Sequence, residues 1–155
     1  MEEYTTLKRD EMLVVGIELK TSNDPKRGPL EIPKHWDRFF KEQVQSRIPS
    51  KISDEVIALY CDYEGDHTKP YTLVIGSAVS SIDNIPEGMV FKKVPAGHYA
   101  LFQAVGPHPE ALISTWGKIW QSNSLDRTYT GDFEVYGAHF SQKSPPEIEV
   151  LIAVR

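Results

Sequence analysis

The sequence predicts an α+β fold of two β-α-β-β halves, at about residues 11–82 and 88–155, related by a pseudo-twofold axis. Three observations predict it. Strand and helix patterns occur in the same order in both halves, aromatic residues recur at one spacing on the two predicted helices, and the strands after each helix align. We expect one antiparallel sheet, two helices on one face and a central cleft between them, in a single domain of 155 residues.

The first half begins with a buried strand at residues 12–19, an apolar run that contains Gly16. A polar loop separates it from an amphipathic helix, in which Pro33 is expected in the first turn, where its missing N–H is tolerated. Strands at residues 55–63 and 71–80 complete the half as a hairpin. The helix is marked by Ile32, Trp36, Phe39, Phe40 and Gln43 at helical spacing, and Pro49 ends any continuation.

The second half repeats this order. Residues 89–105 are strand-like and are interrupted at 95–97, and a helix begins between Pro107 and Pro109. Two further strands are expected at residues 131–140 and 147–155. The apolar face of the second helix consists of Leu112, Ile113, Trp116, Ile119 and Trp120.

The repeat is carried by three alignments. Trp36 and Phe40 match Trp116 and Trp120 at an offset of 80 residues. Residues 57–60 match residues 133–136 at an offset of 76, and the last strands, from Tyr71 and from Ile148, match at 77. Such small shifts are expected where loops of different length join equivalent elements.

Composition excludes several classes of function. The net charge of −5 and the absence of any run of more than two basic residues argue against a nucleic-acid surface. One cysteine, Cys61, excludes an internal disulfide, and five histidines without metal-binding spacing indicate neither a metal site nor a cofactor. The first residues are acidic and polar, and no apolar run approaches a membrane span, so we expect a cytoplasmic protein.

A single carboxylate stands out among apolar residues of the penultimate strand. Side chains alternate along a strand, so Glu134 and Tyr136 share one face, as Ala58 and Tyr60 do in the first half. The tyrosines are therefore paired across the pseudo-twofold axis, while the charge occurs once. If the helices cover this face, aromatic side chains enclose Glu134. If they cover the face of Phe133, Glu134 is a solvated strand residue, and alternation does not decide between the two.

Together the motifs resemble the gyrase-inhibitor-like, or AraC-type, effector-binding domain, which also serves multidrug-sensing regulators. The resemblance rests on residues 94–102 (VPAGHYALF), Gly106-Pro107, residues 116–120 and residues 133–136 (FEVY), and it covers nearly the whole chain. In the first half it rests on residues 15–17, 21–23, 36–39 and 71–76.

The resemblance implies the same duplicated fold and a ligand cleft between the helices, where an acidic residue meets a lipophilic or aromatic cation. The glutamate of the family falls on Glu134. The predicted ligand-binding residues are Glu134, Tyr136, Tyr60, Trp36, Phe40, Trp116, Trp120 and Phe102. The alternative to ligand binding for the aromatic side chains of the helices is packing in the core. We expect core packing alone for Phe39, Leu112 and Ile119.

Residues 1–11 are too few for a DNA-binding module, so we expect a stand-alone binding domain without direct contact to nucleic acid, similar to members encoded on integron cassettes. A small molecule is the expected partner. The oligomeric state, a homodimer included, and a link to a regulator or to gyrase stay open. Two alternatives differ in class: a hydrolase that uses Glu134 as general base, and a protein-interaction module of the gyrase-inhibitor type.

Overall fold

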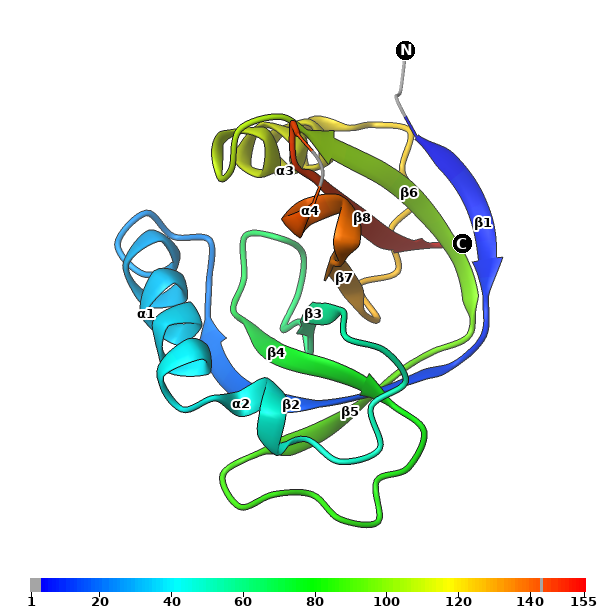
Figure 1. Ribbon diagram of the computed structural model, residues 1–155. Helices are drawn as coiled ribbons and strands as arrows, with labels where there is room; N and C mark the ends of the chain where they lie inside the picture. Colours follow the sequence, from blue (N-terminus) through cyan, green and yellow to red (C-terminus); the bar gives the residue numbers. More distant parts are fainter. Residues whose placement is uncertain (1–3, 143) are drawn as a thin grey trace.

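The computed structural model describes residues 4–142 and 144–155. These residues form one eight-stranded antiparallel sheet in the order β1-β6-β8-β7-β3-β4-β2-β5, with four helices (Figure 1), and the predicted α+β class is confirmed. The strands are β1 (Thr5–Arg9), β2 (Met12–Thr21), β3 (Val56–Cys61), β4 (Tyr71–Val79), β5 (Val90–Val94), β6 (Gly97–Val105), β7 (Asp132–Tyr136) and β8 (Glu147–Val154). The helices are α1 (Gly28–Lys41), α2 (Val44–Arg47), α3 (Glu110–Gln121) and α4 (Ala138–Ser141).

The order of the strands has the symmetry that the repeat predicts. β3 and β7 are adjacent at the centre, and β4 with β2 on one side corresponds to β8 with β6 on the other. Ala58 of β3 lies directly opposite Glu134 of β7, so the two positions that the repeat equates form one cross-strand pair. The pseudo-twofold axis therefore passes between these two residues.

Two strands pair across the halves: β1, which precedes the predicted start of the first half at residue 11, and β5, which begins the second half. β1 pairs with β6, and β5 pairs with β2, which makes β1 and β5 the two ends of the sheet. Arg9 lies opposite Gly97 and Met12 opposite Val94, so the two ladders continue one another in a single register. The sheet consequently curls strongly, as Figure 1 shows.

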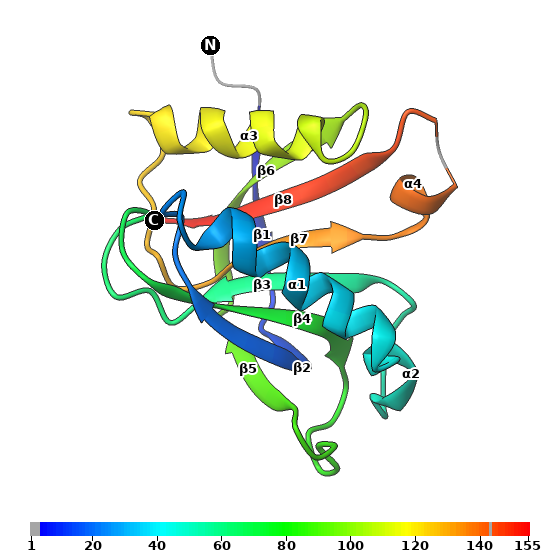
Figure 2. The same ribbon diagram turned by 90° about the vertical axis from the view of Figure 1, so that its left-hand side faces the viewer.

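Helices α1 and α3 lie on one face of the sheet (Figure 2), and two core clusters lie between them and the sheet. The α1 cluster joins Phe39 to sheet residues such as Ala58 and Ile75, and the α3 cluster joins Trp116 and Ile119 to the other half of the same face. Tyr60 and Tyr136 pack against both clusters. The opposite face, which includes Phe133 and Val135, is enclosed by the curled sheet itself. The helices therefore cover the face of Glu134 and Tyr136.

Two glycines allow β2 and β4 to approach closely beneath α1. Gly16 and Gly76 are cross-strand partners, and a Cβ built on Gly16 would lie 2.2 Å from the carbonyl oxygen of Ile75. Gly16 thus marks a close approach of the two strands, and a larger residue there would push them apart.

Several predicted boundaries are wrong. α1 begins at Gly28, one turn early, so that Pro29 occupies the first turn and Pro33 lies inside the helix. The strand expected to continue through residue 140 ends at Tyr136, and α4 follows it. β1 was not predicted, because its sequence TTLKR is mostly polar and is half exposed at the end of the sheet.

The alignment of the last strands is wrong by two residues. Ile75 lies opposite Ala58, and Val150 lies opposite Glu134, so these two positions are equivalent. The sequence alignment instead matched Leu73 with Val150. A shift of the alignment by two residues keeps the same side chains on the same face of the sheet. The pattern of apolar residues therefore does not reveal the error.

Candidate functional site

Glu134 lies at the centre of the sheet, beneath the space between α1 and α3. It occupies a cross-strand row whose other members are apolar: Val150 on one side, and Ala58 and then Ile75 on the other. Only 1% of the Glu134 side-chain surface is exposed. A carboxylate at this depth is costly unless hydrogen bonds or an opposite charge compensate for the lost water.

Three aromatic side chains donate hydrogen bonds to this carboxylate. Trp116 Nε1 donates to Glu134 Oε2 at 2.7 Å, and the Tyr60 hydroxyl donates to the same oxygen at 2.9 Å. The Tyr136 hydroxyl donates to Oε1 at 2.7 Å. All three donors are neutral, and no ion pair of Glu134 occurs among the described residues.

Burial raises the pKa of the Glu134 carboxyl, and the hydrogen bonds from Tyr136, Trp116 and Tyr60 offset only part of this rise. Burial also raises the pKa of the Tyr60 and Tyr136 hydroxyls, and the nearby Glu134 charge raises both further. The two phenols therefore stay protonated as donors. When it is ionised, the Glu134 carboxylate carries a negative charge that no positive group among the described residues neutralises.

The ring contacts around Glu134 follow the pseudo-twofold axis. The Trp36 ring meets the Tyr136 ring edge to face at 5.0 Å, and the Trp116 ring meets the Tyr60 ring in the same manner at 5.2 Å. The two tryptophans differ in their relation to the carboxylate. Trp116 donates a hydrogen bond to Glu134, whereas Trp36 contacts the ring of Tyr136, whose hydroxyl in turn donates to Glu134. Trp116 is buried and Trp36 is partly exposed.

The outer rings lie farther from the charge. Phe40 is 64% exposed and stacks on Trp36 at 6.0 Å, and Trp120 is 39% exposed and lies 6.3 Å from Trp116. Phe40 thus contacts Trp36 and Trp120 contacts Trp116, so each lies outside an inner tryptophan. Their equivalent positions on α1 and α3 agree with the offset of 80.

Phe102 is buried on the same face, farther from the carboxylate. It lies opposite Val150, which in turn lies opposite Glu134, and its ring packs against Tyr4 at 5.0 Å. Of the eight predicted residues, the structure thus brings Tyr60, Trp116 and Tyr136 into contact with Glu134. Trp36, Phe40 and Trp120 form a second layer, and Phe102 lies in the α3 cluster. That these residues bind a ligand stays a prediction.

A second buried carboxylate on β7 escaped the sequence analysis. Asp132 Oδ2 accepts from Arg127 Nη2 at 2.7 Å and from the Tyr63 hydroxyl at 2.5 Å, and Oδ1 accepts from the backbone N–H of Ala153 at 2.8 Å. Asp132 is fully buried. The one sequence signal was its place two residues before Glu134, on the same face of the strand. Its partners gave no signal, because Tyr63 and Ala153 are distant in the sequence and Arg127 lies in a loop. Unlike Glu134, Asp132 has a cationic partner.

Neither a metal site nor a membrane span is found in the parts of the chain that the structure describes. No group of three histidine, cysteine, aspartate or glutamate side chains there could hold a metal ion. No helix there is both long and apolar enough to cross a bilayer.

Comparison with known proteins identifies relatives of the whole fold. An integron cassette protein from the mobile metagenome of Vibrio cholerae superposes with a TM-score of 0.75 at 27% identity, covering 99% of this chain and 97% of that one. The structure of SAV2435 bound to tetraphenylphosphonium superposes with a TM-score of 0.81 at 18% identity, covering 99% and 94%. At the latter identity the likeness shows the fold alone.

Sequence comparison identifies the family. The protein YobU of Bacillus subtilis (strain 168), whose name suggests a transcriptional regulator, is 30% identical over 127 residues, 80% of this chain and 79% of YobU. A family model described as integron-associated effector binding protein matches residues 7–154. The resemblance to effector-binding domains is therefore confirmed, and the chain belongs to the family of integron-associated effector binding proteins.

Proposed function

We propose that this protein binds a lipophilic or aromatic cation above Glu134, between α1 and α3, and that the cation is the effector. The observation that carries the proposal is a buried carboxylate whose hydrogen-bond donors are all neutral. A bound cation supplies the opposite charge that this carboxylate lacks. In a site without water such a pair is worth far more than on the surface.

The surrounding rings suit the apolar part of the same ligand. Ring faces of tyrosine and tryptophan attract a cation with about 0.5–2 kcal/mol each. Stacking makes few directional demands, so the site tolerates ligands of different shape. Charge selects cations and the aromatic lining accepts many of them.

A ligand reaches Glu134 only after side chains move, because the carboxylate is 1% exposed. Tyr60, Trp116 and Tyr136 cover it and hold both oxygens. The cation replaces at least one of these hydrogen bonds by a direct charge contact. Part of the binding free energy therefore opens the site, and affinity depends on how readily these rings rotate.

Relatives support a cationic ligand. SAV2435 shares the fold and was solved with tetraphenylphosphonium, a lipophilic cation. The hydrolase alternative requires a lone pair of Glu134 directed at a substrate, and it stays a prediction.

Titration calorimetry with two probes of similar shape tests the proposal. Tetraphenylphosphonium carries a positive charge, and triphenylphosphine oxide is neutral. In Glu134→Gln we expect the cation to bind about 30-fold more weakly, because losing one partner of a desolvated charge pair costs about 2 kcal/mol or more. The neutral probe should be unaffected. Glu87→Gln, a change in an exposed loop, is the control and should leave both affinities unchanged. Equal cation affinity in wild type and Glu134→Gln contradicts the proposal.

A further inference from the structure

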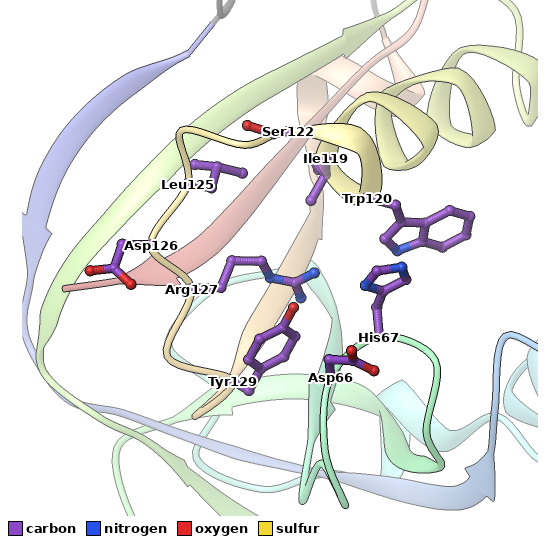
Figure 3. Close-up of a pocket in the computed structure, with 9 residues that line it drawn as sticks. All are labelled: Asp66, His67, Ile119, Trp120, Ser122, Leu125, Asp126, Arg127 and Tyr129. Carbon is purple, nitrogen blue, oxygen red and sulfur yellow. The ribbon is translucent and has the colours of Figure 1, made fainter.

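A pocket of about 320 Å³ lies at the C-terminal end of α3, separate from the carboxylate of Glu134 (Figure 3). One wall comes from the loop between β3 and β4, with Asp66 and His67. The other comes from the loop between α3 and β7, with Leu125, Arg127 and Tyr129. Figure 3 shows the guanidinium of Arg127 directed from its loop toward the ring pair opposite.

Arg127 brings unused hydrogen-bond donors to this pocket. Its side chain is 6% exposed, and Nη2 donates to Asp132 at 2.7 Å. Nε and Nη1 are also buried, and neither has an acceptor among the described residues. A buried N–H without a partner is costly, so an oxygen acceptor that reaches either donor after neighbouring side chains move gains a hydrogen bond.

Flat aromatic surfaces border the same space. The rings of Trp120 and His67 are stacked nearly parallel, 5.9 Å apart and 9° from coplanar, and so connect α3 to the β3–β4 loop. The Arg127 guanidinium lies 4.3 Å from the centre of the Tyr129 ring. Tyr129 has a backbone φ of 56°, in the left-handed region that a ring-bearing residue rarely adopts. The loop thus holds this ring against the guanidinium in a conformation that costs free energy.

The charges around the pocket favour an uncharged ligand. The charge of Arg127 is balanced by Asp132, which is fully buried. Asp126 is bound by Arg155, and its carboxylate points away from the ring pair (Figure 3). Asp66 is exposed at the rim. The pocket therefore presents no net positive charge that would attract a free anion.

We propose that this pocket binds a planar, uncharged ring that carries a carbonyl oxygen. The oxygen accepts from one of the two unpaired Arg127 donors, Nε or Nη1, and the ring lies against Trp120. The proposal rests on Arg127, Tyr129 and the Trp120–His67 pair, of which only Trp120 is also among the residues predicted for the cation site.

Three probes of nearly identical shape test it: benzamide, benzoate and benzamidinium. Each is titrated into the 15N-labelled full chain while the Nε–Hε signal of Arg127 and the indole N–H signal of Trp120 are followed. We expect benzamide to shift both signals with saturation and to bind at least fivefold more tightly than benzamidinium, which has no acceptor oxygen. Benzoate should bind more weakly than benzamide. Benzoate binding more tightly, or benzamide leaving the Arg127 signal unmoved, overturns the proposal.

Two exposed positions of α3 provide matched variants. Arg127 itself is unsuitable, because its ion pair with Asp132 supports the fold. Trp120→Ala should weaken benzamide about 2- to 10-fold, as expected for the loss of one stacked ring. Ile113→Ala, which removes an apolar side chain that is 65% exposed, should leave the affinity unchanged. Equal benzamide affinity in wild type and Trp120→Ala contradicts the assignment of the ring to Trp120.

Discussion

Replacing Glu134 by glutamine should stabilise the folded protein at neutral pH. Burial raises the pKa of the Glu134 carboxyl above its ordinary value of 4.5, despite three hydrogen bonds that lower it. The folded state therefore binds this proton more tightly than the unfolded chain does. The resulting stability is fully present below about pH 4.5 and is lost as the pH rises through the higher folded pKa, by at most about 1.4 kcal/mol per pH unit.

Glutamine keeps the hydrogen bonds and removes the titration. Its amide oxygen can accept from Trp116 and Tyr60, and its NH₂ group can donate to the hydroxyl oxygen of Tyr136. Neutral replacements of buried charges are often stabilising by about 1–4 kcal/mol. We therefore expect Glu134→Gln to be about 1–3 kcal/mol more stable than the wild type at pH 7. Near pH 4 the two should differ by less than about 0.5 kcal/mol, because both are then neutral at this position.

Urea denaturation between pH 4 and pH 8, followed by tryptophan fluorescence, measures both quantities. Asp132→Asn is the matched control on the same strand, because it leaves Arg127 buried without its partner and should destabilise by about 3–5 kcal/mol. A Glu134→Gln variant that is less stable than the wild type at pH 7 refutes the reasoning. So does a stability difference that does not change with pH.

Three further predictions concern the same site. Tyr136→Phe removes the only donor to Glu134 Oε1 among the described residues. It should destabilise the protein by about 1–3 kcal/mol at pH 7, measured by urea denaturation. It should also raise the pKa of Glu134 further, measured by a 13C NMR titration of the carboxyl group. An unmoved pKa contradicts this. Phe40→Ala should change stability by less than about 0.5 kcal/mol, since the ring is 64% exposed, yet weaken tetraphenylphosphonium about 2- to 5-fold in calorimetry if Phe40 lies against the ligand. An unchanged affinity removes Phe40 from the site. Cation affinity should fall on acidification, and the fall should begin above pH 4.5 because burial raises the pKa of Glu134. A constant affinity from pH 7 to pH 4 opposes a charge role for Glu134.

The sequence was sufficient for the architecture because the signals that specify it are periodic. Trp36 and Trp116 occupy equivalent places on α1 and α3, and Ala58 and Glu134 are cross-strand partners at the axis, as their offsets predicted. Periodicity fails at the ends of elements. The start of α1 at Gly28 depends on the turn that precedes Pro29, which periodicity does not reveal. The residues of α4 were predicted as strand, because their composition allows a helix or a strand.

The candidate site was predictable only in part, for a similar reason. Alternation placed Glu134 and Tyr136 on one face, but the choice of face came from the family resemblance. That three aromatic donors would close over the carboxylate depends on side-chain rotamers and on contacts 18 and 74 residues apart in the sequence. Arg127 and Asp132 were missed because a buried ion pair has no periodic signal, and only tertiary structure brings Tyr63 to it.

The two ends of the sheet bear on how copies of the chain meet. An unpaired strand offers N–H and C=O groups to any neighbour, and short, basic strands discourage such association. β1 and β5 each have five residues, and each carries two basic side chains, Lys8 with Arg9 and Lys92 with Lys93. Pairing one molecule with another through β1 brings like charges together along the shared edge. At β5 the charge of Lys92 is already paired with Asp62, so Lys93 carries most of this effect there. The pseudo-twofold arrangement thus places a short strand with basic side chains at each end of the sheet.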